Sequence, residues 1–145
     1  MKNTSIGIAS SHGKENIHGA GVPERKWICE QRLFLESMAD AVKSVMDFRK
    51  DKMVFINVMF NMSIDCDCAE FPEEPRFRDI GILSSLDPVA LDQACVDLVY
   101  ACEDKEGTAP LRKRMEDLQA VHILETGVEL GIGTRNYELI NIDKK

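Results

Sequence analysis

The stretch at residues 79–99, DIGILSSLDPVALDQACVDLV, decides the fold because a strand pattern leads directly into a helix pattern. Asp79–Ser84 is short and apolar and predicts a strand. Asp87 and Pro88 then supply an N-cap and a first-turn proline for a helix that runs to about Cys102. The apolar stripe of this helix consists of Leu91, Ala94, Cys95, Leu98 and Val99. Strand signals that alternate with helical ones are typical of an α/β protein.

The segments before this stretch repeat the alternation. Met53–Phe60 (MVFINVMF) is almost uniformly apolar, so we expect a central strand covered on both faces, within which Asn57 must find hydrogen-bond partners. Residues 28–48 form an amphipathic helix whose apolar stripe is Leu35, Met38, Val42, Val45 and Met46. Ser5–Ser10 (SIGIAS) is interpreted as a first strand, and residues 11–27 as a long loop punctuated by glycine and proline.

The segments after it predict one more helix and an edge strand. Thr108 and Pro110 open the last helix, and Gly131 ends it in a left-handed cap. The inward-facing residues of that helix are Leu111, Met115, Leu118 and Val121. Residues 137–142 are expected to form a closing edge strand. The predicted fold is therefore α/β, with a small mixed or mostly parallel sheet and helices packed on its faces.

Length, charge and composition narrow the class of protein. A chain of 145 residues, 44% of them hydrophobic, has the size of one domain, which we place at residues 1–145. The 18 basic and 25 acidic residues give a net charge of −7, which disfavours nucleic acid as a partner. No run approaches the roughly 18 apolar residues of a membrane span, and the five cysteines fit no disulfide framework. We expect a cytoplasmic protein.

Three polar clusters follow the three predicted strands. The first spans residues 10–18 and contains His12, Lys14 and His18, the second lies in the loop at residues 61–78, and the third includes Ser84, Ser85 and Asp87. Ligands of open α/β sheets bind beyond the carboxyl ends of parallel strands. If the strands are parallel, as the intervening helices imply, the three clusters meet at one edge of the sheet.

The second cluster contains the most unusual tetrapeptide of the chain, Asp65-Cys66-Asp67-Cys68, which we call the DCDC loop. Its two thiols could bind zinc or iron together with His12 and His18, could form a redox disulfide, or could be small residues of a tight turn whose aspartates cap backbone amides. The spacing matches no standard zinc pattern, and no ferredoxin-type cluster motif is present. The neighbouring carboxylates raise the pKa of the thiols, which argues against a reactive thiolate unless Lys14 or a histidine compensates.

Two other functions remain open. In the first, the chain is an enzyme that acts on a small anionic metabolite, with Lys14 as anion clamp, His18 as acid or base and Asp67 orienting it. In the second, it is a structural or assembly module. His122 is expected to serve packing or capping within the last helix, and Arg112–Arg114 to form a solvated face balanced by Glu116 and Asp117.

Five segments carry a resemblance to a known family: GIASSHGKENIH (7–18), LESMADAV (35–42), DCDC (65–68), residues 79–99, and HILETGVELGIGTRNYELI (122–140). The resemblance runs from the first to the last of these segments and so extends over most of the chain. They resemble the C-terminal portion of the uncharacterised iron–sulfur centre proteins, a domain-of-unknown-function family. In that family a ferredoxin-like module with two cysteine-rich motifs follows the first segment, and this chain lacks it. The resemblance therefore supports the domain and its DCDC loop, but not cluster binding.

The resemblance also has implications for individual residues and for assembly. Ten positions match the motifs of the family, without settled roles: Lys14, His18, Asp65, Cys66, Asp67, Cys68, Asp79, Asp87, Pro88 and Asp92. It implies that the 145 residues are a reduced homologue or the C-terminal part of a split or truncated protein. Either case would leave a sheet edge or an apolar patch exposed, so we expect a homodimer or a missing N-terminal partner portion.

Overall fold

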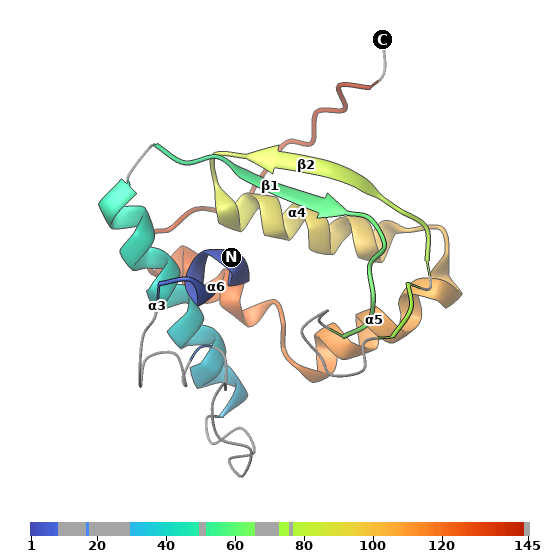
Figure 1. The fold of residues 1–145 in the computed structure, drawn as a ribbon, viewed down its shortest axis with the longest axis horizontal. Coiled ribbons are helices and arrows are strands. Elements are labelled where there is room, and N and C mark those ends of the chain that lie inside the picture. The colour runs from blue at the N-terminus through green and yellow to red at the C-terminus, as the bar shows by residue number, and fades with distance from the viewer. Residues whose placement is uncertain (9–16, 18–29, 50–51, 66–72, 76, 144–145) are drawn as a thin grey trace.

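The computed structural model describes residues 1–8, 17, 30–49, 52–65, 73–75 and 77–143 (Figure 1). A two-stranded ribbon lies on one long helix, and a group of three helices lies beside them (Figure 1). The elements are α1 (Lys2–Ile6), α3 (Gln31–Arg49), β1 (Phe55–Met59), β2 (Gly81–Ser85), α4 (Pro88–Ala101), α5 (Lys105–Asp117) and α6 (His122–Glu129). The α/β class predicted from the sequence is confirmed.

The two strands run antiparallel, so the expectation of parallel strands is wrong for this pair. Phe55 pairs with Ser85, and Met59 pairs with Gly81. Parallel neighbours need a crossover connection, usually a helix. The described residues between the strands, 60–65, 73–75 and 77–80, form no helix. The helical segments that implied parallel strands lie before β1 and after β2, not between them.

One face of the ribbon is covered by α4, and the other is exposed (Figure 1). Asn57 and Met59 point toward α4, and Met59 is buried. Val58 and its cross-strand partner Ile82 point the other way and are 59% and 61% exposed. Coverage of β1 on both faces, expected from its uniform apolar sequence, is therefore wrong: the described part of the chain supplies only one covering layer.

The main core lies where α3, α4 and α6 meet. Leu35, Met38 and Val42 are buried, which confirms the amphipathic helix predicted at residues 28–48 for the part that is described. The core cluster consists of Met1, Ala39, Val42, Val89, Leu124 and Ile132. The N-terminal helix α1 packs against α3 (Figure 1).

The first predicted strand, Ser5–Ser10, is wrong where it can be compared, because Ser5 and Ile6 belong to α1. Ser5 is fully buried, and its hydroxyl donates to the carbonyl of Lys2 at 2.7 Å. A short apolar run does not distinguish a strand from one turn of buried helix. Residues 9–10 and most of the predicted loop at residues 11–27 lie outside the described residues.

The last predicted helix is two helices, α5 and α6. Asp104, not Thr108, is the N-cap of α5, since its side chain accepts from the amide of Gly107 at 2.8 Å. Thr108 lies inside α5, fully buried. The chain turns at Gln119, whose φ of 51° is left-handed. Of the four predicted inward residues, Leu111, Met115 and Val121 are half-buried and Leu118 is 38% exposed.

The predicted end of the last helix is confirmed. Gly131 has a φ of 68°, its amide donates to the carbonyl of Val128, and the amide of Ile132 donates to the carbonyl of Gly127, both at 2.9 Å. These two bonds form a Schellman motif. The expected edge strand at residues 137–142 is not formed within the chain, where this segment is an exposed tail.

Candidate functional site

The antiparallel ribbon separates the polar clusters that the sequence places at one edge. Asn61, which follows β1, lies near the start of β2, where its amide donates to the carboxylate of Asp79 at 2.8 Å. Asp87 lies at the opposite end of the ribbon, after β2. The predicted convergence of the second and third clusters is therefore wrong. His12, Lys14, His18, Cys66, Asp67 and Cys68 lie outside the described residues.

The DCDC loop begins at an ion pair. Asp65 Oδ1 lies 2.7 Å from Nη2 of Arg114 on α5, and the hydroxyl of Ser63 donates to the carbonyl of Asp65 at 2.6 Å. The sequence indicated that the basic cluster was balanced within its own helix. This is correct for Lys113, which pairs with Asp117 at 2.7 Å, but Arg114 reaches Asp65 instead. No sequence spacing signals a contact between residues so far apart.

Asp87 has a structural role, as its N-cap prediction indicates. Its Oδ1 accepts from the amides of Val89 at 2.8 Å and Ala90 at 3.0 Å, and Pro88 is the first residue of α4. Its Oδ2 accepts from the amide of Thr134 at 2.8 Å, which attaches the segment after α6 to the start of α4. The N-cap prediction is confirmed, and both carboxylate oxygens already have backbone partners.

A polar cluster lies between β1 and α4, beneath the ribbon. Asn57 Nδ2 donates to Asp92 Oδ1 at 2.8 Å and to Cys95 Sγ at 3.3 Å, so the expectation that Asn57 finds hydrogen-bond partners is confirmed. Asp92 Oδ2 also contacts the Met1 ammonium at 2.5 Å. Burial raises the pKa of Cys95; the hydrogen bond from Asn57 opposes this shift, and the nearby Asp92 charge adds to it. Asn57 lines two hollows, of about 260 and 490 Å³.

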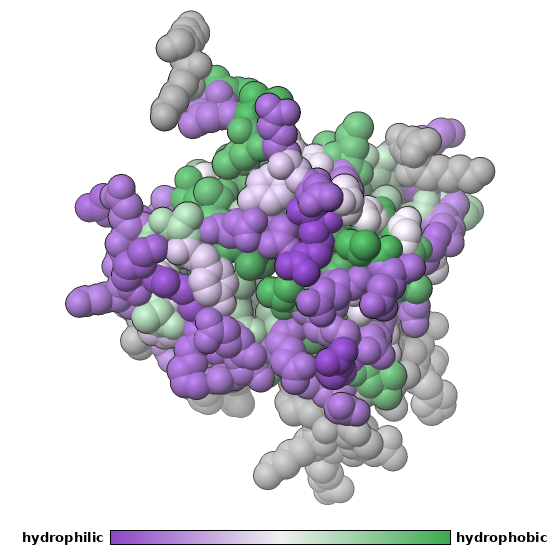
Figure 2. All heavy atoms as spheres, turned by 180° about the vertical axis from the view of Figure 1, so that it is seen from behind, coloured by the Kyte–Doolittle hydropathy of each residue, from purple (hydrophilic) through white to green (hydrophobic). Residues whose placement is uncertain are grey.

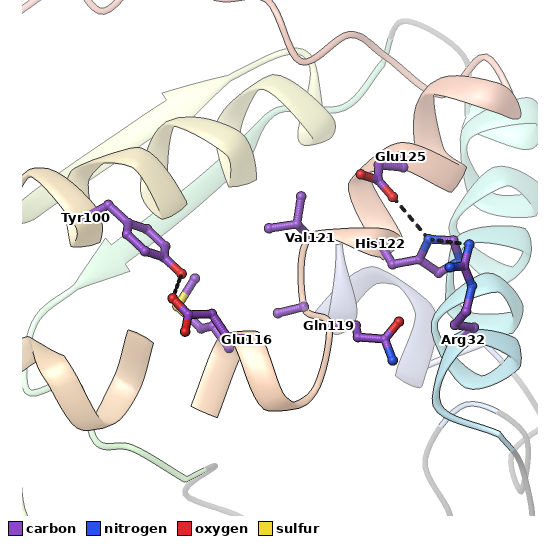
Figure 3. Close-up of a pocket in the computed structure, with 9 residues that line it drawn as sticks. Arg32, Tyr100, Glu116, Gln119, Val121, His122 and Glu125 are labelled. Carbon is purple, nitrogen blue, oxygen red and sulfur yellow. Dashed lines mark hydrogen bonds and ion pairs between the residues drawn. The ribbon is translucent and has the colours of Figure 1, made fainter. Parts of the chain in front are cut away.

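The second polar site is an open groove of about 310 Å³ around His122, at the start of α6 (Figure 3). His122 Nε2 lies 2.8 Å from Glu36 Oε1 on α3, and Nδ1 lies 3.2 Å from Glu125 Oε2. Arg32 lies 3.5 Å from Nδ1. Tyr100 and Glu116, hydrogen-bonded at 2.9 Å, form the opposite wall (Figure 3).

These partners shift the pKa of His122. The hydrogen bond to Glu36 raises the pKa of the imidazole above its usual value; burial opposes this, the bond to Glu125 supports it, and Arg32 opposes it. The side chain of His122 is only 11% exposed, which agrees with the expected packing role. Its imidazole also joins α6 to α3 through the contact with Glu36. The N-cap of α6 is Val121, so His122 is not a capping residue. The sequence gives no signal for the partner Glu36.

The described ranges hold no group of three or more His, Cys, Asp and Glu side chains that could bind a metal ion. In the same ranges, no helix is both long and apolar enough to cross a membrane.

The fold and these clusters define a mixed α/β domain with acidic side chains at both ends of its ribbon. Residues 1–97 match the model of a family described as a domain of unknown function, DUF362. The chain belongs to this family. Neither a curated protein nor a solved structure matches it.

Proposed function

We propose that this chain is a small ligand- or metal-binding domain with its site at the DCDC loop. The observation that carries the proposal is the ion pair between Asp65 and Arg114, because it attaches the start of the loop to α5 at 2.7 Å. A loop that begins at a fixed point of the fold can present its next side chains to a ligand with less loss of conformational entropy.

The ion pair also bears on the chemistry of the thiols. Two carboxylates beside two thiols disfavour the thiolates that soft metals require. Arg114 compensates the charge of Asp65, so this obstacle is reduced to the single carboxylate of Asp67. The remaining candidate ligands are Cys66, Cys68, His12 and His18, a set of sulfur and nitrogen donors that suits zinc or iron.

Other described side chains do not add to this set. Asp87 is occupied as an N-cap, and Cys95 on α4 has a thiol of raised pKa that accepts a hydrogen bond from Asn57 on β1. Lys14 is proposed to hold an anionic ligand or a negatively charged metal complex. The resemblance to iron–sulfur centre proteins supports iron, but two thiols in one loop are fewer than the four that a ferredoxin-type cluster requires.

A second candidate function is a structural or assembly module of a redox protein. It is favoured by the outer face of the ribbon, which the described elements leave uncovered. In that case Cys66 and Cys68 form a turn and bind no metal.

Elemental analysis of untagged protein, purified without chelator and compared with two variants, distinguishes these functions. We expect about one zinc or iron per chain in the wild type, and its loss from Cys66→Ser/Cys68→Ser. The matched control is Cys102→Ser, since Cys102 is a half-buried free thiol at the end of α4, and it should keep the metal. If no protein contains metal, and apo-protein takes up neither zinc nor ferrous iron, the metal proposal is overturned.

A further inference from the structure

The outer face of the β1–β2 ribbon is an uncovered apolar surface. We call it the ribbon face and define it by the apolar residues that alternate with the α4-facing positions: Val54, Ile56, Val58, Phe60, Ile82 and Leu86. Each is at least 43% exposed. The described residues also provide no third strand, so β1 and β2 each keep one free edge. Contiguous exposed apolar surface with free strand edges is typical of an interaction site.

The C-terminal tail, residues 137–142 (YELINI), is a second uncovered apolar segment of the same chain. Leu139, Ile140 and Ile142 are 54%, 72% and 87% exposed. The main chain of residues 138–142 forms no hydrogen bond with any other described element. Figures 1 and 2 show the tail projecting from the body, and Figure 2 shows hydrophobic atoms along it.

Two contacts fix where the tail begins. The amide of Thr134 donates to Asp87 at 2.8 Å, and the hydroxyl of Tyr137 donates to Asp97 Oδ2 at 2.7 Å, both on the α4 side of the molecule. The start of the tail is thus attached to α4, while its apolar end is exposed to solvent. Its alternation places Ile140 and Ile142 on one face of an extended strand.

We propose that the tail of one copy of this chain adds as a strand to a free edge of the ribbon of a second copy. Strand addition satisfies the unpaired main chain of both segments, while Ile140 and Ile142 extend the ribbon face beside residues such as Ile82. Each copy carries one tail and one ribbon, so the exchange closes reciprocally as a two-fold dimer. The occupant is a second copy because the same sequence supplies both sides of the contact, an exposed apolar tail and an uncovered ribbon with free edges.

The mass in solution under reducing conditions, measured by sedimentation velocity over a dilution series, tests the proposal. We expect a wild-type particle of twice the 16.3 kDa chain mass. Ile140→Asp/Ile142→Asp and Val58→Asp/Ile82→Asp should each be monomeric. The matched control is Phe48→Asp, because Phe48 is an apolar side chain 79% exposed on α3, and this variant should remain dimeric. Circular dichroism checks that each variant is folded.

A peptide separates exchange between copies from other causes of dissociation. The labelled peptide of residues 135–143 (RNYELINID) should bind saturably to the monomeric Ile140→Asp/Ile142→Asp variant, whose ribbon is intact. It should not bind to Val58→Asp/Ile82→Asp, and a peptide carrying both aspartates should bind to neither. A monomeric wild type, or a dimer unchanged by both double substitutions, overturns the proposal. Neither result depends on whether the DCDC loop holds a metal.

Discussion

Asn57 on β1 donates a hydrogen bond of 2.8 Å to Asp92 on α4, and this bond joins the ribbon to the helix that supports it. The same amide donates to Cys95, one turn further along α4. A polar side chain that faces a helix beneath a strand is stabilising only when its donors are satisfied, as they are here.

We therefore predict that Asn57→Ala lowers the free energy of unfolding by about 1–3 kcal/mol, because it removes both hydrogen bonds and leaves the half-buried Asp92 carboxylate with one donor fewer. Urea denaturation measures this change. Asn136→Ala is the matched control, since Asn136 is exposed, and its effect should stay within about 0.5 kcal/mol. Equal stability of Asn57→Ala and the wild type would show that the contact contributes nothing.

The link through His122 predicts a dependence of stability on pH. Its pKa is raised in the folded state, chiefly by Glu36, so the stabilisation is fully present below the unfolded pKa and is lost as the pH rises through the folded pKa. The groups around the imidazole are Glu36 and Arg32 on α3, Glu125 on α6, and Arg135 beyond Glu125.

We expect His122→Gln to be less stable than the wild type at pH 5.5 by about 1 kcal/mol, a value that allows for the solvent exposure of both glutamates. The difference should shrink at alkaline pH. Urea denaturation across pH measures it, and an NMR titration of the imidazole gives the pKa directly. Glu36→Gln should move that pKa back toward its usual value; an unchanged titration would contradict the assignment to Glu36.

A glycine lies directly against each of the two capping carboxylates, Asp87 at the start of α4 and Asp104 at the start of α5. A Cβ on Gly133 would clash with Asp87 Oδ1, and one on Gly107 would clash with Asp104 Oδ2. We predict that Asp87→Ala costs about 2 kcal/mol, at the upper end for an N-cap, because it also releases Thr134. Asp104→Ala, which removes a cap without such a tether, should cost less.

Gly133→Ala tests the contact between Gly133 and the Asp87 cap by changing the glycine instead of the aspartate. The added methyl group must displace the Asp87 carboxylate, so its cost should approach that of Asp87→Ala, and the two costs should not add in the double variant. Thermal or urea denaturation of the three variants measures this coupling. Additive costs would mean that the glycine and the cap act independently.

Arg114 connects the fold to the proposed metal site. If the DCDC loop binds metal, Arg114→Ala should weaken metal retention several-fold against a competing chelator, because the charge that offsets Asp65 is lost. Its cost in stability should be within about 1 kcal/mol, as for an exposed ion pair. Lys113→Ala is the adjacent control, since Lys113 pairs with Asp117. Equal retention by both variants would remove Arg114 from the site.

The sequence predicted elements well where local chemistry determines them. The three- and four-residue spacing of Leu35, Met38 and Val42 predicted α3, and Asp87 with Pro88 predicted the start of α4. Gly131 marked the end of α6. These signals act within one or two turns of chain, so they can be interpreted without knowledge of the tertiary fold.

The sequence predicted the structure less well where contacts between distant residues determine it. The direction of β2 depends on the course of the connection after β1, and the apolar sequence of Met53–Phe60 does not show that one of its faces lacks cover. The pairs Asp65–Arg114 and Glu36–His122 join residues far apart in the chain. The predicted ligands in residues 11–27 and at Cys66–Cys68 stay predictions.

The position of α4 has a consequence for the cooperativity of the molecule. Among the described elements, the ribbon and α5 pack on α4, and α4 joins the group of α1, α3 and α6 through α6, through the contact of Asp92 with the Met1 ammonium and through the shared core. A two-stranded ribbon is marginally stable on its own. Amides of β1 and β2 should therefore exchange with solvent through local opening while those of α3 and α6 stay protected. Opening of α4, in contrast, should expose the amides of the ribbon and those of the helices that pack with α6 at the same time.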